Sequence, residues 1–336
     1  MRAAAHRSRQ RQPTSITSSR GRGTPWTWAT TSCWPTAGPT TGNGTGFRLA
    51  IRIQRTTRRT GEPVAWTVSY GKGRAFHCTL GHDTSALYTP NVMALLARAT
   101  EWAATGSVTL AATAELVPAA KDPVRVLVVT GGHSYDPSFY RVFEGRRDIA
   151  WSHATSQKEA FSPNLPKRWD VLVLYDMYNQ IGEAEKTNLR AFVEAGKGVV
   201  ALHHSIVDYT SWPWWYEEVI GGKYFEQPEA THPASHYREG VPIVARTVPG
   251  KQNHPIVRGL GDLVTIDECY QGMWHSRRIE VLMETDSACN DRQLVYLGPR
   301  PHTVYIQLGH ETYTHEHPGY RQLVHNAILW SADRLQ

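Results

Sequence analysis

The chain has 336 residues, enough for one large domain or two of medium size, and 40% of them are hydrophobic, which is sufficient for a buried core. No apolar run approaches the roughly 18 residues that a membrane helix requires, so the sequence predicts no membrane partner. The formal net charge is +6, but residues 1–61 contain eleven arginines and no acidic residue, which leaves residues 62–336 with a net charge of −5. A mildly acidic folded part argues against nucleic-acid binding, because such binding needs a basic surface patch.

The four cysteines, Cys33, Cys78, Cys269 and Cys289, are scattered without a Cys-x-x-Cys spacing. This pattern predicts free or buried thiols rather than a disulfide framework or a zinc knuckle. No clear signal peptide is present, so we expect a cytoplasmic protein.

Residues 1–60 are rich in Arg, Thr, Ser, Gly and Trp and show neither helical nor strand periodicity. Three interpretations are open for this segment: a disordered tail, an acid-poor targeting peptide, and a stretch that is not a natural reading frame. We expect a disordered or non-native tail, with poor order in either case.

A hairpin and a helix follow this tail. Residues 64–70 alternate like a strand, Gly71-Lys72-Gly73 forms a turn, and residues 74–80 are typical of the returning strand. Pro90 begins a helix that extends to about residue 104, because proline is favoured in a first helical turn. Residues 105–121 are rich in Ala, Thr and Pro and are predicted to be a linker.

The same pattern returns near the other end of the sequence at a constant offset of 228 residues. Leu80-Gly81-His82-Asp83 matches Leu308-Gly309-His310-Glu311. The matches continue without a gap through the helix: Pro90 with Pro318, Leu95 with Leu323, Ala99 with Ala327, and Trp102 with Trp330. We therefore predict that residues 61–104 are the C-terminal fragment of an internal repeat whose complete copy spans residues 122–336. We expect the fragment to pack against the complete domain or to remain partly exposed.

Residues 122–336 alternate between predicted strands and helices. Residues 124–130 form a continuous apolar run, which is typical of a parallel strand buried on both faces. Further strands are predicted at 149–153, 171–175, 198–202, 241–248, 279–285, 293–297 and 303–309, and helices at 183–195 and 318–332. This alternation predicts an α/β fold with a doubly wound, mostly parallel sheet.

Polar residues come directly after several of these strands: Gly132 and His133, Asp176, His203 and His204, and His310 and Glu311. Ligands of open α/β sheets bind beyond the carboxyl ends of the strands, so we expect these residues to share one crevice. Glu268 lies in a predicted loop, 267–270, that could return over the same edge. Clustered imidazoles and carboxylates can transfer protons, and equally they can hold a divalent metal ion such as zinc or manganese.

Several of these residues also have structural interpretations. His204 could equally be a buried packing or hydrogen-bonding histidine. The aromatic run, Tyr209, Trp212, Trp214, Trp215 and Tyr216, is either a core cluster or a wall that stacks on a sugar, and Trp214 is the candidate for stacking. Structural or surface roles are expected for the remaining histidines of interest: His232, His236, His275, His302, His315 and His325. Gly131-Gly132 lacks the spacing of a phosphate-binding loop, so nucleotide binding is not predicted.

Residues 122–336 resemble the trehalose utilisation (ThuA-like) family, whose fold is that of class I glutamine amidotransferases, with flavodoxin-like layering. The motifs that carry the resemblance are Val126–His133, Gly198–Ser205, Ile220–Phe225, His254–Leu260 with Asp267-Glu268, and Leu308–Glu311 with the helix through Trp330. Residues 61–104 resemble the tail of a second such domain. The resemblance implies a ligand related to carbohydrates.

The resemblance also implies where a nucleophile would lie. Class I amidotransferases present a cysteine in a tight Gly-x-Cys-x-Gly turn after the corresponding strand, whereas this turn is Ala201-Leu202-His203-His204-Ser205. Cys269 lies elsewhere and Ser205 lies past the turn. We therefore expect no glutaminase activity, because an imidazole cannot replace the thiolate that forms the thioester.

Together, these residues predict a domain that acts on, or binds, a sugar or a sugar-derived small molecule. His203 would be the acid/base, Glu268 or Glu311 would orient it, and His310 would contact the substrate or a metal ion. His204 belongs to the same candidate catalytic group, and Gly132, His133, Asp176 and Trp214 are the candidate substrate-binding residues. The alternative is a non-catalytic ligand-binding or interaction module that retains the fold. A structural appendage of a longer gene product and a homo-oligomer are also open.

Overall fold

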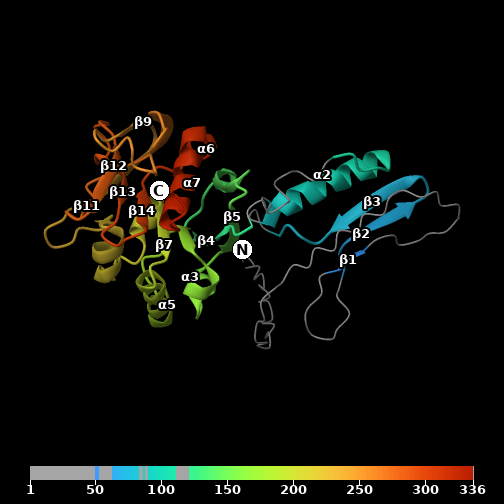
Figure 1. Cartoon of the computed structure of the whole chain (residues 1–336), viewed down its shortest axis with the longest axis horizontal. Helices are drawn as coiled ribbons and strands as arrows, with labels where there is room; N and C mark the ends of the chain where they lie inside the picture. The colour runs from blue at the N-terminus through green and yellow to red at the C-terminus, as the bar shows by residue number, and fades with distance from the viewer. Residues whose placement is uncertain (1–49, 53–62, 83–85, 88–89, 111–120, 336) are drawn as a thin grey trace, which may run out of the picture.

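The computed structural model describes residues 50–52, 63–82, 86–87, 90–110 and 121–335 (Figure 1). The prediction made for residues 1–60 therefore lies outside the described residues, apart from a short strand at Ala50–Arg52. Most of the predicted linker 105–121 also lies outside them. The segments on either side of this linker are described separately below.

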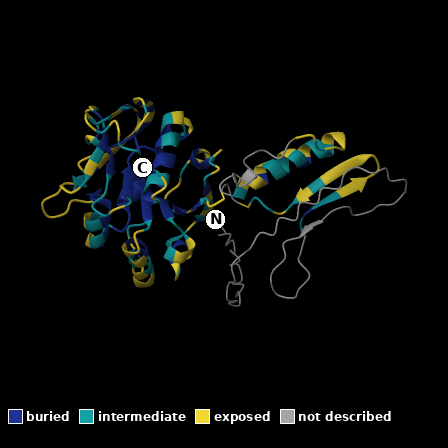
Figure 2. Cartoon of the chain, in the orientation of Figure 1, coloured by how far each residue is buried: buried dark blue, intermediate teal, exposed yellow. Residues whose placement is uncertain are grey.

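The N-terminal segment consists of a small sheet and one helix. Strands β1 (Ala50–Arg52), β2 (Pro63–Tyr70) and β3 (Gly73–Cys78) form an antiparallel sheet in the order β1-β2-β3, and α2 (Pro90–Thr105) follows. Among the residues of 64–110 whose burial is described, only Ala65, Val92 and Ala99 are buried. The cartoon of this segment is accordingly almost entirely yellow and teal, the colours of exposed and intermediate residues (Figure 2). The segment has almost no core of its own.

The C-terminal segment is built on a nine-stranded sheet in the order β10-β9-β12-β13-β14-β7-β6-β4-β5. Its parallel part consists of β4 (Val124–Gly131), β5 (Ile149–Ala154), β6 (Val171–Asp176), β7 (Gly198–Leu202) and β14 (Thr303–Ile306). In chain order these strands have the arrangement 2-1-3-4-5, which is the flavodoxin-like order, and the predicted fold class is confirmed. An antiparallel extension adds β13 (Gln293–Leu297), β12 (Glu280–Glu284), β9 (His236–Thr247) and β10 (Leu263–Gln271).

Helices cover both faces of this sheet and enclose two hydrophobic cores, because successive side chains of a strand point to opposite faces. Val126 and Val128 of β4 enter one core, and Leu127 and Val129 enter the other. The first core is closed by η2 (Pro137–Phe143), α6 (Thr312–Glu316) and α7 (Pro318–Ser331), and the second by α3 (Gln157–Ala160), α4 (Leu165–Arg168) and α5 (Glu183–Glu194). No helix in the described ranges is both long and apolar enough to cross a bilayer.

Most strands lie where the sequence predicts them, but the region 222–275 differs. Residues 267–270, expected in a loop, belong to strand β10, and β9 begins at His236 rather than near residue 241. A two-stranded ribbon, β8 (Gly222–Lys223) with β11 (Trp274–His275), was not predicted. The loop prediction was wrong because two consecutive acidic residues suggest solvent exposure, whereas here both are buried by partners from elsewhere in the fold.

Candidate functional site

The site begins at the sharp turn where β7 ends. Leu202 is the last residue of the strand, and His203 opens the short 3₁₀ helix η3 (His203–Val207) with a φ of +49°. A non-glycine residue in this left-handed region is strained, and such strain is characteristic of functional turns. The Tyr305 hydroxyl donates a hydrogen bond of 3.0 Å to the His203 carbonyl and helps to hold the turn.

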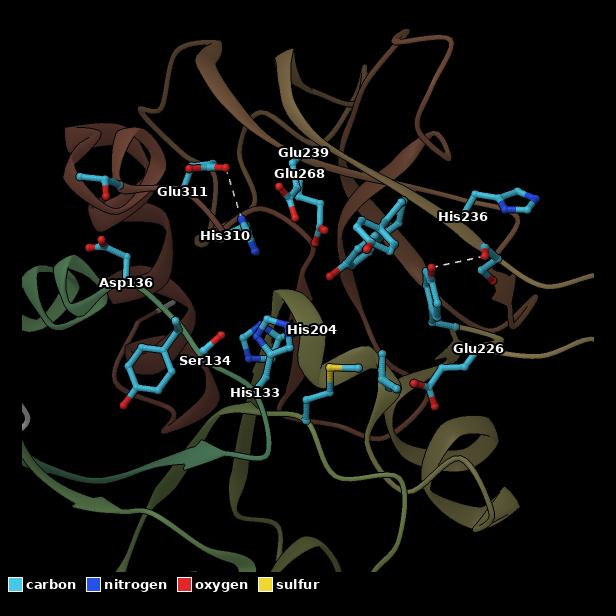
Figure 3. A pocket seen from close by; sticks show the side chains of 18 of the residues that line it. His133, Ser134, Asp136, His204, Glu226, His236, Glu239, Glu268, His310 and Glu311 are labelled. Atoms are coloured by element: carbon cyan, nitrogen blue, oxygen red, sulfur yellow. Dashed lines mark hydrogen bonds and ion pairs between the residues drawn. The ribbon is translucent and has the colours of Figure 1, made fainter. Parts of the chain in front are cut away.

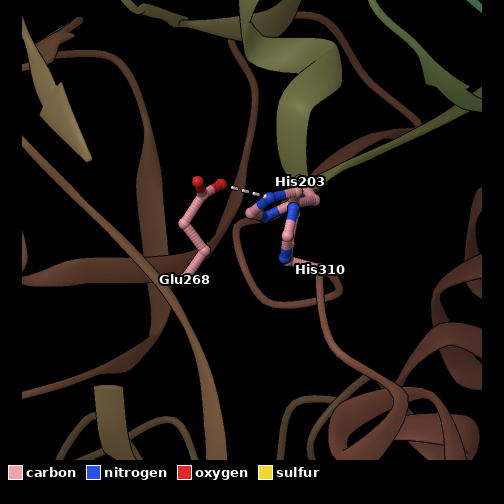
Figure 4. Close-up of side chains that lie close together, drawn as sticks. All are labelled: His203, Glu268 and His310. Atoms are coloured by element: carbon pink, nitrogen blue, oxygen red, sulfur yellow. Dashed lines mark hydrogen bonds and ion pairs between the residues drawn. The ribbon is translucent and has the colours of Figure 1, made fainter. Parts of the chain in front are cut away.

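The His203 imidazole is fully buried and is held at both ring nitrogens. Its Nδ1–H donates to the Gln307 carbonyl oxygen at 2.7 Å. This bond directs Nε2 toward the Glu268 carboxylate, 2.8 Å away (Figure 4). The Tyr270 hydroxyl lies 2.9 Å from the same nitrogen. The carbonyl therefore fixes which nitrogen is available for chemistry.

Electrostatics favour a charged pair between His203 and Glu268. Burial opposes the imidazolium, but the Glu268 hydrogen bond and the charges of Asp267 and Glu268 outweigh it and raise the pKa of His203. Burial likewise opposes the Glu268 carboxylate, yet the hydrogen bond and charge of His203 lower the pKa of Glu268. Because the two shifts have opposite directions, the proton resides on the imidazole.

The neighbouring His204 favours its neutral form. Its Nε2–H donates to the Tyr175 carbonyl at 3.2 Å. Burial, followed by the electrostatic effect of the neighbouring His203 and His133 imidazoles, lowers the pKa of His204 well below its ordinary value. One charged and one neutral imidazole thus lie side by side, with ring centroids 5.4 Å apart, and this is the pairing that acid/base chemistry uses.

The loop after β14 brings His310 and Glu311 to the same place. Asp267, fully buried on β10, accepts hydrogen bonds from the backbone N–H groups of Gly309 and His310, at 2.7 and 2.9 Å, and from the Thr314 hydroxyl at 2.8 Å. The His310 ring then lies 5.3 Å from the His203 ring, centroid to centroid. Glu311 is 3.4 Å from His310 Nδ1.

Three of these side chains could hold a metal ion. The ligand atoms of His203, Glu268 and His310 all lie within 4.8 Å of one another (Figure 4). Two imidazole nitrogens and one carboxylate oxygen form a common donor set for zinc. The hydrogen bond from His203 Nδ1–H to the Gln307 carbonyl is of the kind that orients a metal-binding histidine through its second ring nitrogen.

Glu268 and His310 border a cleft of about 990 Å³ at the carboxyl ends of the parallel strands (Figure 3), and His203 lies next to them, fully buried. Its lining combines histidines, carboxylates and tyrosines: His133, His204, His236, His310, Asp136, Glu226, Glu239, Glu268, Glu311, Tyr135, Tyr224, Tyr237 and Tyr270. No lysine or arginine occurs among the lining residues within the described part of the chain. The cleft is therefore suited to uncharged, hydroxyl-rich or cationic ligands rather than to anions.

A second pair of titratable groups lies beneath the cleft. Asp176 and Asp208 are both buried and are hydrogen-bonded to each other, and Asp176 also accepts a bond from the Tyr209 hydroxyl at 3.1 Å. Burial raises the pKa of Asp176 to about 7, and burial together with the charge of Asp176 raises the pKa of Asp208 well above its ordinary value. The pair therefore shares one proton.

Because the pair shares one proton, we expect the free energy of unfolding to depend on pH. A carboxyl whose pKa is higher in the folded than in the unfolded protein stabilises the fold at low pH, and that stability is lost as the pH rises through the folded pKa of about 7. The free energy of unfolding, measured in urea, should fall between about pH 5 and pH 8 by up to about 1.4 kcal/mol per pH unit. Asp176→Asn should remove most of this slope.

The matched control is Asp286→Asn. Asp286 is exposed, and its hydrogen bond with Arg246 lowers the pKa of its carboxyl, so it titrates below this pH window. The control variant should keep the wild-type slope. An unchanged slope in Asp176→Asn would contradict a shared proton at this pair.

Of the other candidate residues, His133 lines the cleft, whereas Gly132, Trp214 and Asp176 do not. Gly132 adopts a φ of +74°, and a Cβ there would lie 2.1 Å from the Met177 carbonyl, so glycine is required where two loops cross. This crossing brings His133 against His204, with ring centroids 4.9 Å apart. Trp214 lies outside the cleft lining, with the Arg190 guanidinium 4.4 Å above its ring. The stacking role predicted for Trp214 has no support in this arrangement. Asp176 is fully buried and is likewise absent from the lining of the cleft.

Several residues of the site were not predicted from the sequence. Tyr270 shares a face of β10 with Glu268, and the period of two along a strand would have identified it had β10 been recognised. Gln307 and Asp267 position His203 and the His310 loop through bonds between distant segments, for which the sequence has no signal. The outer wall formed by residues 224–239 was also missed.

Comparison with known proteins adds a family match. A family model described as trehalose utilisation (ThuA) matches residues 12–103 and 125–331. A ThuA-like protein from Parabacteroides merdae is 16% identical, with a TM-score of 0.53 over 63% of this chain and 90% of its own. One from Bacteroides uniformis is 18% identical, with a TM-score of 0.50 over 63% of this chain and 93% of its own. At these identities the likeness shows the fold alone. No curated protein matches the chain in sequence.

Proposed function

This chain belongs to the trehalose utilisation (ThuA) family, and from this membership we propose that its cleft binds, and acts on, a sugar or a sugar-derived small molecule. The observation that carries the proposal is the lining of the cleft, which has histidines, carboxylates and tyrosines but no lysine or arginine among its described residues. Hydroxyl groups both donate and accept hydrogen bonds, so they match such a mixture of carboxylates and imidazoles. A phosphorylated or carboxylated ligand would lack a cationic partner there.

The proton-transfer element of the proposal is the His203–Glu268 pair. In its charged form His203 is the general acid, and Glu268 holds the imidazolium in place. Glu311, next to His310, is a further carboxylate on the cleft wall and would contact the ligand together with His310. This arrangement keeps the role expected for His203 and favours Glu268, rather than Glu311, as its orienting partner.

A divalent metal ion, zinc or manganese, is the cofactor that His203, Glu268 and His310 would hold. Such an ion would act as a Lewis acid toward a bound oxygen. With a metal ion bound, Nε2 of His203 would have no proton and would serve as a ligand. Proton transfer by His203 and metal binding by His203 would therefore exclude each other. Metal content therefore separates these two modes of action.

Glutaminase chemistry is not part of the proposal. His203 occupies the strained turn in which an amidotransferase would carry its cysteine. Cys269 is buried within the first hydrophobic core, and burial raises the pKa of its thiol to about 11, which disfavours a thiolate.

The second candidate function is a non-catalytic ligand-binding module. It is favoured by the replacement of the nucleophile in a fold that is otherwise retained. The cleft would then bind the same class of ligand without turnover.

We also propose that residues 61–104 are the C-terminal fragment of a second copy of the domain. With the offset of 228 residues, β2, β3 and α2 correspond to β13, β14 and α7, and Gly81 and Gly309 have positive φ values of 107° and 131°. The hairpin register differs by two residues, since Thr67 pairs with Phe76, whereas Val295 pairs with Ile306. The longer turn in the complete copy accounts for this shift.

A thermal-shift screen tests the proposed function. Mono- and disaccharides, including trehalose and keto-sugars, are added to the full chain in buffer with EDTA, zinc or manganese. A ligand that binds the native state should raise the Tm, by roughly 2.7 kcal/mol of stabilisation at a hundredfold excess over its Kd. Glucose 6-phosphate, the charged control, should not raise it.

The screen has three informative outcomes. A sugar-dependent shift that needs zinc or manganese, together with one bound ion per chain, supports the metal-dependent enzyme. A shift in EDTA supports proton transfer or simple binding, which a turnover assay then separates. If no sugar raises the Tm under any condition, the proposed function is wrong.

A further inference from the structure

His204 carries a buried hydrogen-bond acceptor without a partner. The side chain is 3% exposed and lies on the floor of the cleft, beside His133 (Figure 3). Its Nδ1 atom has no hydrogen-bond partner among the described residues. Buried polar atoms are nearly always paired, so an unpaired atom beside a ligand cleft needs an explanation.

The tautomer of His204 is fixed by the backbone. Nε2 lies 3.2 Å from the Tyr175 carbonyl oxygen, which can only accept, so Nε2 must carry the hydrogen. In a neutral imidazole the other nitrogen then presents a lone pair. Nδ1 is therefore an acceptor, and its partner must be a donor.

We propose that His204 Nδ1 accepts a hydrogen bond from a hydroxyl group of the ligand and so selects a hydroxyl at one carbon of the sugar. This inference rests on the proposed function, because it names the group that the same cleft recognises. A phosphate, a carboxylate or a ketone at that carbon has acceptors only and would leave Nδ1 unpaired. Binding of such a ligand would bury two acceptors against each other.

The surroundings of His204 favour an uncharged donor over an ammonium group. The ring of His203, which carries the proton of the His203–Glu268 pair, lies 5.4 Å from that of His204, centroid to centroid. The Tyr175 ring lies 4.4 Å away, and Met177 and Val207 line the adjacent wall. A hydroxyl needs no counterion in these surroundings. His133 is exposed and its ring lies 4.9 Å from that of His204, centroid to centroid, so movement of the His133 side chain would give a ligand more room beside His204.

Two substitutions separate the two nitrogens of His204. The amide of glutamine reaches the position of Nε2, so His204→Gln keeps a donor for the Tyr175 carbonyl but has no acceptor at the position of Nδ1. The shorter amide of asparagine reaches the position of Nδ1, so His204→Asn restores an acceptor there. His82→Ala is the control, since this histidine is exposed and is not among the residues that line the cleft.

The test compares glucose with its series of monodeoxy analogues by calorimetry. Wild type and His82→Ala should bind one analogue roughly tenfold or more weakly than glucose, because that analogue leaves Nδ1 unpaired. In His204→Gln this discrimination should disappear, and in His204→Asn it should return. Discrimination that persists in His204→Gln would overturn the inference while leaving sugar binding intact.

A second measurement does not depend on sugar affinity. Nitrogen-15 NMR of the full chain should show His204 protonated at Nε2 alone, and a high concentration of glycerol, used as a hydroxyl probe, should shift the Nδ1 resonance. His204→Gln identifies the resonance by its disappearance. If none of the sugars binds, the proposed function fails, and an unshifted Nδ1 resonance in glycerol would independently overturn the role of His204.

Discussion

Replacing His203 with alanine is expected to abolish turnover, or sugar binding if the domain is a binding module. His203 is the fully buried group that joins the Gln307 carbonyl on one side to Glu268 and Tyr270 on the other. Removal of a positioned general acid typically lowers the rate by roughly 10²–10⁴-fold. Ligand binding by calorimetry and kcat on the sugar found in the screen measure the effect.

Two further variants separate loss of function from loss of fold. His203→Asn suits the backbone, because asparagine tolerates the left-handed φ of +49° better than alanine does. It should keep the wild-type circular dichroism spectrum and still lose activity. His236→Ala, in the same cleft but outside the His203 cluster, should stay within about threefold of the wild-type value, the scale of a weak exposed contact. Unchanged binding and turnover in both His203 variants would remove His203 from the mechanism.

Asp267→Ala is expected to be the most destabilising single substitution at the site. The carboxylate accepts hydrogen bonds from the N–H groups of Gly309 and His310 and from the Thr314 hydroxyl. The two N–H groups would be left without an acceptor, whereas the Thr314 hydroxyl would keep Thr265 as a partner. Each buried unsatisfied donor costs about 1–3 kcal/mol, so the free energy of unfolding in urea should fall by about 3–5 kcal/mol. The His310 loop should also lose its position.

Asp262→Ala provides the comparison for this loss. Asp262 precedes the same strand, its side chain is 58% exposed, and it lies 3.6 Å from Arg246 in a surface ion pair. Such a pair contributes about 0–1 kcal/mol. Asp267→Asn, which keeps one acceptor oxygen, should be intermediate. Equal stability of Asp267→Ala and Asp262→Ala would show that Asp267 does not hold the loop.

The parallel half of the fold could be predicted from the sequence because its strands are continuous apolar runs. β7 is buried along its whole length and β4 is buried apart from Arg125 and its last residue. Polar residues follow each strand, His203 after β7 and His133 shortly after β4. The structure places His133, His203 and His310, which follow three of the predicted strands, near one another at one edge of the sheet. Local sequence therefore identified the strand ends from which the site is built.

The antiparallel half could not be predicted in the same way. β10 carries Asp267 and Glu268 at its centre, and local rules treat consecutive acidic residues as part of a loop. Their burial is compensated by groups from residues 203 and 309–314, which local patterns do not connect with β10. The role of Gln307 is equally hidden, since it acts through its backbone carbonyl. Likewise, Asp208 gains its partner only when η3 packs beneath β6.

The position of β14 has a consequence for how the protein is made. β14 lies between β7 and β13, so β7 acquires its second neighbour only from residues 303–306. On the ribosome, the strand that leads into His203 remains an open edge until these residues have emerged. Such an edge can pair with other chains, and a nascent domain in this state is a natural client for a chaperone. The strand insertion that completes the central sheet also brings the His310 loop to His203, so a chain interrupted before that step lacks the assembled His203–His310 site and keeps an open sheet edge.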